Sequence, residues 1–273
     1  MGVFKIIVEF YYPYGKKKAL TFSYDDGQIY DRRLVDIFNK YQLKATFHLN
    51  SGTIGTEGFI SKNEVEALYK GHEISCHSVN HPHLTQLPRV ELVEEIWEDR
   101  RQLEELSGYP IRGMSYPFGE YDNTCIKALE VLGIEYSRTV NSTNNFSLPS
   151  RFLEWKPTCH HNNEIIDKLK AFKNQALWSK LPLFYIWGHS YEFQRQNNWD
   201  IIEKFCEAAA YDSDVWYATN IEIKDYICAL RNLVFDVNKT KVYNPSATVV
   251  WLGFGEEIVE LMPGKTVVLK SNI

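Results

Sequence analysis

Short apolar runs alternate along the chain with segments in which apolar residues recur every three or four positions. The first pattern is typical of buried strands and the second of amphipathic helices. The predicted strands are 18–24, 44–50, 73–78, 112–119, 134–140, 182–190 and 215–220. The predicted helices are 31–41, 61–72, 89–107, 123–133, 163–178, 197–210 and 221–232. An extended segment over 152–162 fits neither pattern well.

Residues that favour helix ends support two of these boundaries. Ser61, followed three residues later by Glu64, forms the pattern of a capping box, and Gly71 is placed to end that helix. Gly108 and Pro110 mark the end of the long helix before them.

The order of the elements predicts the fold class. Strands that are mostly apolar without alternation, each followed by a helix, imply a parallel sheet covered on both faces. Polar residues recur at the carboxyl ends of the strands, which is typical of (β/α) barrels, where functional groups gather at that face. These residues are Asp25, Asp26, His77, Tyr116, Arg138 and His189. We therefore predict an α/β barrel.

The pattern changes from about residue 233 onward. There, β-branched runs alternate with Asn-Lys, Asn-Pro-Ser and Pro-Gly-Lys turns, and no helical period remains. We predict two domains, a barrel over 1–232 and a small β-rich appendage over 233–273.

The composition and charge of the chain limit the classes of binding partner that we expect. The formal net charge is −5, which does not favour nucleic acid or an acidic membrane surface. No apolar stretch reaches the length of about 18 residues that a membrane span needs. The segment 1–18 has only a short apolar patch, broken by Lys5 and Glu9, and lacks the features of a signal peptide. We therefore expect a cytoplasmic protein with no nucleic-acid or membrane partner.

Two histidines and two aspartates suggest a metal site. His77 and His81 are four residues apart, a spacing that lets two imidazoles reach one ion if the segment forms a turn, although the spacing alone is weak evidence. With Asp26 they give the three-ligand set of a hydrolytic zinc site that keeps one position open for water. Asp25 would then be free to act as a base. A polar turn or a helix cap is the plainer explanation of the two aspartates.

Two further segments suggest catalytic roles only if such a metal site is present. Pro117 and Gly119 fix a turn after Tyr116, which could aim backbone N–H groups at an oxyanion, although an ordinary loop explains the turn equally well. His189 ends an apolar strand, where a lone histidine is more often structural. If the metal site lies on the same face, His189 becomes the natural general acid.

Four motifs, SYDDG (23–27), HSVNH (77–81), SYPFG (115–119) and the strand that ends in His189, together resemble the polysaccharide deacetylases. This is the nodulation-factor deacetylase homology family, carbohydrate esterase family 4, and the resemblance covers about residues 18–230. It implies a distorted (β/α)7 barrel and a metal-dependent hydrolase that removes N- or O-acetyl groups from sugars.

The resemblance also implies a role for each matching residue. Asp25 would be the base, and a divalent metal, commonly zinc, would be bound by three ligands. The backbone around Tyr116 would help to hold the oxyanion, and His189 would be the acid. The implied ligands are Asp26, His77 and His81.

The chain departs from the family pattern at two places. The third motif usually begins with an arginine that tethers the base, but this chain has Ser115, and Arg112 lies too early. We expect Arg138, at the end of the next strand, to supply that charge. The usual Asp and Trp beside the acid are not recognisable, so the residue that orients His189 is unassigned. Asp214 lies at a spacing that resembles this part of the family pattern, but it follows His189 in the sequence instead of preceding it.

The unusual stretch WKPTCHHN (155–162) admits two interpretations. One is a polar loop with a buried cysteine. The other is a loop that lines the substrate site, with His160 or His161 near the acetyl group and Trp155 or Trp187 stacked on a sugar; Pro117 joins this predicted lining. A second metal site is possible here, but no matching spacing elsewhere supports it.

Three functions are therefore consistent with the sequence. The preferred one is a metal-dependent deacetylase acting on an acetylated carbohydrate, with zinc as the expected cofactor. An amidase with a non-sugar substrate would use the same ligands. A carbohydrate-binding barrel that has lost activity is the third, and Ser115 in place of the arginine keeps it open.

Overall fold

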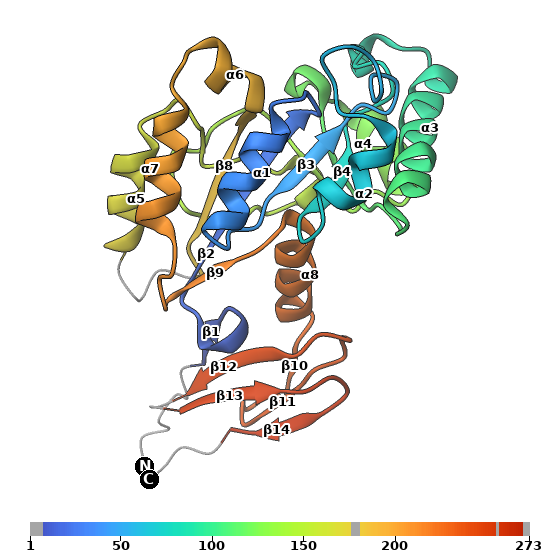
Figure 1. The fold of residues 1–273 in the computed structure, drawn as a ribbon. Coiled ribbons are helices and arrows are strands. Elements are labelled where there is room, and N and C mark those ends of the chain that lie inside the picture. Colours follow the sequence, from blue (N-terminus) through green and yellow to red (C-terminus); the bar gives the residue numbers. More distant parts are fainter. Residues whose placement is uncertain (1–7, 176–180, 255–256, 270–273) are drawn as a thin grey trace, which may run out of the picture.

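The computed structural model describes residues 8–175, 181–254 and 257–269, and most of them form a parallel barrel surrounded by helices (Figure 1). The strands lie in the order β6-β5-β4-β3-β2-β8-β7, and β9 pairs with the first residues of β2. Their bounds are β2 (Lys18–Asp26), β3 (Thr46–Leu49), β4 (Glu73–Cys76), β5 (Gly113–Ser115), β6 (Tyr136–Arg138), β7 (Cys159–His160), β8 (Leu183–His189) and β9 (Val215–Tyr217).

The extended segment around Trp155 connects the two ends of this strand order. The amide of Thr139 donates to the Trp155 carbonyl at 2.9 Å, and the Trp155 amide donates to Ser137 at 3.0 Å. Thr158 then donates to the carbonyl of Tyr185 on β8 at 2.8 Å. This segment therefore bridges β6 and β8, and the predicted distorted (β/α)7 barrel is confirmed.

The predicted helices are present, mostly with shorter bounds. They are α1 (Asp31–Lys40), α2 (Val65–Leu68), α3 (Arg89–Ser107), α4 (Asn123–Val131), α5 (Ile165–Lys173), α7 (Trp199–Ala209) and α8 (Asn220–Arg231). The chain adds α6 (Ser190–Arg195), which follows β8 directly. The part of the predicted helix 163–178 that covers 176–178 lies outside the described residues.

Two elements are shorter in the structure than the sequence predicts, one because of a tertiary contact and the other because of a local turn. The helix expected over 61–72 keeps its capping box but ends at Leu68, where Tyr69 turns inward and donates to the buried Asp31 at 2.7 Å. The strand expected over 112–119 ends at Ser115, because Pro117–Gly119 form a 3₁₀ turn.

The β-rich appendage lies below the barrel in Figure 1 and consists of two antiparallel three-stranded sheets, β1-β12-β13 and β10-β11-β14. Their strands are β1 (Glu9–Tyr11), β10 (Val234–Phe235), β11 (Lys241–Tyr243), β12 (Val250–Phe254), β13 (Glu257–Leu261) and β14 (Thr266–Val268). The sequence did not anticipate that β1, from the N-terminal part of the chain, pairs with β12. The domain boundary at residue 232 stays a prediction.

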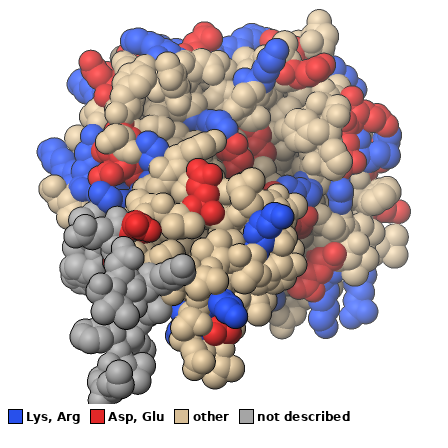
Figure 2. All heavy atoms as spheres, turned by 90° about the horizontal axis from the view of Figure 1, so that it is seen from below, with Lys and Arg blue, Asp and Glu red and all other residues tan. Residues whose placement is uncertain are grey.

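The described surface carries charges of both signs, as the composition of the chain suggests. Figure 2 shows acidic and basic side chains interspersed over the face seen from below, without one sign dominating the described residues there. Among the helices that the structure describes, none is both long and apolar enough to cross a bilayer.

The N-terminus of α8 is fixed to the barrel through Glu73, a buried carboxylate at the start of β4. Glu73 accepts hydrogen bonds from the Ile221 amide at 2.9 Å, the Thr46 hydroxyl at 2.8 Å and the Tyr136 hydroxyl at 2.7 Å. Burial raises the pKa of Glu73 from 4.5 to about 7, although these hydrogen bonds oppose the shift.

This shift predicts how the stability of the protein depends on pH. Because the folded-state pKa is raised, the stabilising contribution is present below pH 4.5 and is lost as the pH rises through 7. We expect the free energy of unfolding to fall between about pH 5 and 8.5, and Glu73→Gln to reduce that fall by about 1–3 kcal/mol.

Urea denaturation at the two pH values measures this difference. Glu66→Gln, at an exposed position of α2, is the matched control and should keep the wild-type pH dependence. An equal fall in Glu73→Gln and wild type would show that Glu73 is ionised throughout.

Candidate metal and acid–base site

The site begins where β2 ends, at two consecutive aspartates that face the same place. Nε2 of His77 lies 3.9 Å from Oδ2 of Asp25 and 3.7 Å from Oδ1 of Asp26. Neighbouring residues of a regular strand point in opposite directions, but Asp26 has a φ of 80°, in the left-handed region. This local twist of the backbone brings both carboxylates to one side.

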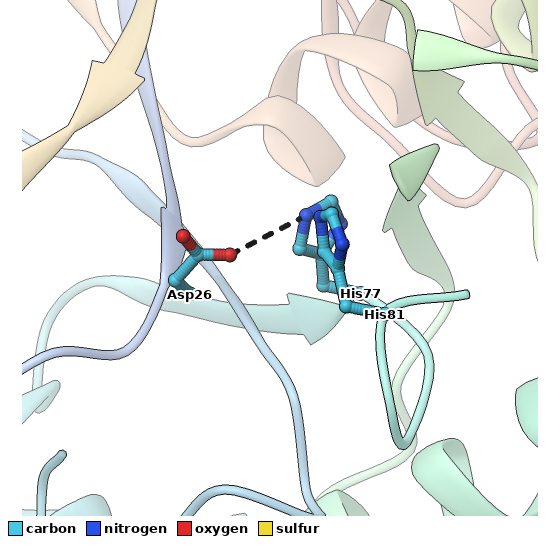
Figure 3. A group of neighbouring side chains, drawn as sticks. All are labelled: Asp26, His77 and His81. Atoms are coloured by element: carbon cyan, nitrogen blue, oxygen red, sulfur yellow. Dashed lines mark ion pairs between the residues drawn. The ribbon is translucent and has the colours of Figure 1, made fainter. Parts of the chain in front are cut away.

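A second left-handed turn brings the two histidines together. After β4, Ser78 and His81 have φ values of 64° and 54°, and the His81 amide donates to the Ser78 hydroxyl at 3.1 Å. The two imidazole centroids are 4.7 Å apart. Figure 3 shows Asp26, His77 and His81 turned toward one another, with the ion-pair contact from Asp26 to His77 drawn as a dashed line.

The orientation of His77 is set by its surroundings. Its Nδ1 lies 2.8 Å from the Ser115 carbonyl, which can only accept, so Nδ1 carries the proton and Nε2 keeps its lone pair. Asp99 of α3 accepts the His77 amide at 2.9 Å and thereby holds its backbone. Burial lowers the pKa of His77 despite the carboxylates of Asp25 and Asp26 beside it, which favours the neutral ring that a metal requires.

These residues fit a divalent metal ion. Asp26, His77 and His81 each offer one ligand atom, and the three atoms lie within 4.8 Å of one another. Two neutral imidazoles and one carboxylate suit zinc and leave a position for water. The structure therefore brings together the predicted ligand set, and its role as a metal site stays a proposal.

Asp25 is held by the arginine that the sequence suggested as a substitute. The guanidinium of Arg138, which is fully buried, forms an ion pair with Asp25, while the Ser115 hydroxyl donates to the same carboxylate at 3.2 Å. Arg138 also donates to the Ser23 hydroxyl at 3.1 Å and lies 4.3 Å from the Trp187 ring centroid. Burial would raise the pKa of Asp25, but Arg138 holds it well below its usual range.

The two other charged residues considered for these roles lie elsewhere. Arg112 pairs with Asp225 at 2.6 Å and with Glu135 at 3.2 Å. Asp214, which precedes β9, pairs with Lys17 at 3.3 Å, at the opposite end of β2 from the two aspartates.

His189 lies at the end of β8, in register with Asp25 on the neighbouring strand. The residue that orients it is Glu192 of α6, which accepts the His189 amide at 3.0 Å and places Oε2 3.3 Å from its Nδ1. Burial opposes protonation of His189, but Glu192 and the nearby aspartates raise its pKa. Glu192 is the third residue after His189, a capping-box spacing that the sequence could have revealed.

The backbone donor predicted at Tyr116 needs a correction. The Tyr116 amide already donates to the Arg138 carbonyl at 3.0 Å, and its ring is buried. Gly119 is likewise engaged, donating to Tyr116 at 2.8 Å. Within the described residues, the Phe118 amide has no such acceptor, and the Phe118 ring is exposed and packs 4.5 Å from the ring of His81. Phe118 is therefore the available donor of this turn.

The predicted substrate-binding residues differ in how far their side chains are buried. Trp155 and His161 are buried, at 1% and 0% exposure, so Trp155 cannot stack on a sugar and His161 cannot contact an acetyl group. Trp155 instead packs among core aromatic rings such as Tyr185, because its segment is part of the barrel wall. Pro117 is also buried. Trp187 and His160 are half-buried and remain candidates for contact with a substrate.

The pairing of Arg138 with Asp25 predicts a test that does not depend on activity. In Arg138→Met, Asp25 loses its cation in a buried site, so the free energy of unfolding should fall by about 3–5 kcal/mol. The double variant Arg138→Met with Asp25→Asn should recover more than half of that loss, because no uncompensated charge remains.

Arg112→Met is the matched control for this test. It removes an arginine from a partly exposed pair and should cost about 1 kcal/mol or less. Urea denaturation measures all three variants. Equal losses in the two single variants, or no recovery in the double variant, would contradict a charge pair at Asp25.

Known proteins provide independent comparisons. Residues 13–137 match the sequence model of the family described as polysaccharide deacetylase. The peptidoglycan-N-acetylglucosamine deacetylase PgdA of Listeria monocytogenes is 28% identical over 123 residues, which is 45% of this chain and 26% of PgdA. The chain thus matches only about a quarter to a third of the length of the first curated relatives.

Solved structures share the fold at low sequence identity. A Mycobacterium smegmatis protein assigned as a polysaccharide deacetylase has a TM-score of 0.61 and 17% identity, and the match covers 81% of this chain and 93% of that protein. The carbohydrate esterase family 4 domain of a xylanase from the hindgut metagenome of Trinervitermes trinervoides has a TM-score of 0.54 and 16% identity, covering 76% and 89%. Over residues 13–137 the chain is thus similar to the polysaccharide deacetylase family, and its barrel has the fold of these solved structures.

Proposed function

We propose that this protein is a metal-dependent carbohydrate deacetylase that removes N- or O-linked acetyl groups from a polysaccharide or oligosaccharide. The observation that carries the proposal is the position of Asp25. This carboxylate is paired with Arg138 and lies within 3.9 Å of His77, a member of the candidate ligand set. A base is thus fixed beside a metal site, although the family arginine is missing at position 115.

The ligand set indicates what the cofactor would contribute. A divalent ion held by Asp26, His77 and His81, zinc by the nature of these donors, supplies a water molecule of lowered pKa and polarises the acetyl carbonyl.

Asp25 accepts the proton of the attacking water in this proposal. Arg138 keeps the carboxylate ionised, and the Ser115 hydroxyl fixes its orientation through a 3.2 Å hydrogen bond. A carboxylate with a depressed pKa is a weak base, so it suits a water molecule that is already acidic.

The other two roles belong to Phe118 and His189. The free amide of Phe118 can donate to the oxyanion as the carbonyl becomes tetrahedral. His189, whose pKa Glu192 raises against the effect of burial, gives a proton to the leaving amine or alcohol through the nitrogen that does not face Glu192. Half-buried Trp187, in contact with Arg138, is a candidate for the wall that the sugar meets.

Acetate release tests the proposal directly. Zinc-loaded protein should release acetate from at least one member of a panel of acetyl-glucosamine oligomers, peptidoglycan fragments and acetylated xylan. Asp25→Asn should lower kcat by about 10²- to 10⁴-fold, because the water loses its base. Asp167→Asn, at an exposed helix position, should keep wild-type activity.

Two other outcomes would redirect the assignment. Glycan binding without acetate release from any panel member would favour a carbohydrate-binding barrel. Hydrolysis of simple amides without activity on the glycans would favour an amidase.

The role of His189 predicts a dependence on the leaving group. His189→Asn should lower kcat for an N-acetyl sugar by about 10²- to 10⁴-fold, because an amine leaves poorly without a proton. The loss should be much smaller with 4-nitrophenyl acetate, whose leaving group is stable as an anion. Glu192→Gln should show the same selectivity with a smaller loss. An equal loss on both substrates would mean that His189 does not act as the acid.

A further inference from the structure

A second group of potential metal ligands lies beside His189 and outside the ligand set described above. It consists of His160 at the end of β7, His161 after it, and Glu192 of α6. Oε2 of Glu192 is 3.0 Å from Nε2 of His160 and 3.3 Å from Nε2 of His161. Three ligand atoms from two separate segments of the chain thus converge on one point.

The ring of His161 is buried and closely packed, as expected for a residue with a specific structural or binding role. Its ring is fully buried, stacked 4.1 Å from Phe193 and 5.7 Å from Tyr24. It occupies space that exists only because residue 188 is glycine, since a Cβ there would lie 2.0 Å from Nδ1 of His161. The chain therefore reserves a specific place for this imidazole.

The nitrogens of His161 are nevertheless without hydrogen bonds to any described residue. A buried polar group without a partner costs about 1–3 kcal/mol. Nδ1 of His189, 3.3 Å from the same carboxylate oxygen, also lacks a hydrogen bond of good geometry. The unpartnered nitrogens of His161 and the Glu192 carboxylate beside them are what a bound cation would satisfy.

The charge states also suit a cation. Burial lowers the pKa of His161 to about 3, so its ring is neutral. Burial would raise the pKa of Glu192, but the neighbouring histidines hold it below the usual range, so the carboxylate is ionised. Nδ1 of His160 accepts the Asn162 amide at 3.3 Å, which leaves its proton on Nε2. Binding a metal at that nitrogen requires the other neutral tautomer, with the proton on Nδ1.

The spacing of the ligand atoms favours zinc. Tetrahedral zinc with bonds of about 2.0–2.1 Å to nitrogen and oxygen separates its ligand atoms by about 3.3–3.4 Å. The separations of 3.0 and 3.3 Å around Glu192 are close to this value. They are smaller than the 3.7 Å between His77 and Asp26 in the first set.

We propose that His160, His161 and Glu192 bind a second divalent metal ion of the zinc type. The binding of this metal does not depend on the proposed deacetylase function.

Metal stoichiometry tests the site without any measurement of activity. Metal-free protein is dialysed against Zn²⁺, and the bound metal is counted for each variant. We expect two ions per chain in the wild type, one in His160→Gln, one in Asp26→Asn and none in the double variant. His83→Gln, which removes an exposed histidine that lies 3.0 Å from Glu120, is the matched control and should keep two.

Two further readouts keep the test decisive. His161→Phe should also bind one ion, and if it fails to fold, the half-buried His160→Gln still reports on the site. Tetrahedral Co²⁺ absorption should fall by about half in His160→Gln and persist at half strength in Asp26→Asn. One ion in both wild type and His160→Gln would overturn the proposal, even if the protein proves to be an active deacetylase.

Discussion

The buried ion pair between Arg138 and Asp25 is the interaction on which the site depends. A carboxylate that is almost fully excluded from water requires a cation. Arg138 supplies it from β6, while Asp25 is the second-last residue of β2. Ser23 and Trp187, from two neighbouring strands, hold the guanidinium in place. The pair therefore joins strand ends across the barrel and keeps Asp25, the proposed base, ionised. It also supplies a cation for Asp25 although this chain has Ser115 where the polysaccharide deacetylases that it resembles usually have an arginine.

The polar groups around this pair form one connected system rather than separate catalytic parts. Ser115 contacts Asp25 through its hydroxyl and His77 through its carbonyl, so the proposed base and a candidate metal ligand share one support. On the other side, Glu192 contacts both His189 and His160. The orientation of His189, the proposed acid, and the proposed second metal site therefore depend on the same carboxylate.

Much of the site could be predicted because the relevant spacing is local. His77 and His81 lie in one turn, and Asp25 and Asp26 are adjacent, so the sequence brings each pair close before the chain folds. Glu192 carried a similar local signal but was not identified. The free amide at Phe118 gave no such signal, because its availability depends on Tyr116 donating to Arg138 on another strand. Burial of Trp155 and His161 likewise depends on distant partners.

By itself, the sequence determined the alternation of strands and helices, the barrel and the set of chemical groups at its carboxyl edge. These follow from periodicity and from short-range spacing, which local backbone geometry controls. The tertiary structure decided which aromatic residues line the core, which arginine neutralises Asp25, and that β1 pairs with β12. These depend on packing and electrostatics between residues far apart in the chain, where the cost of burying a charge or an unpaired polar group selects the partner.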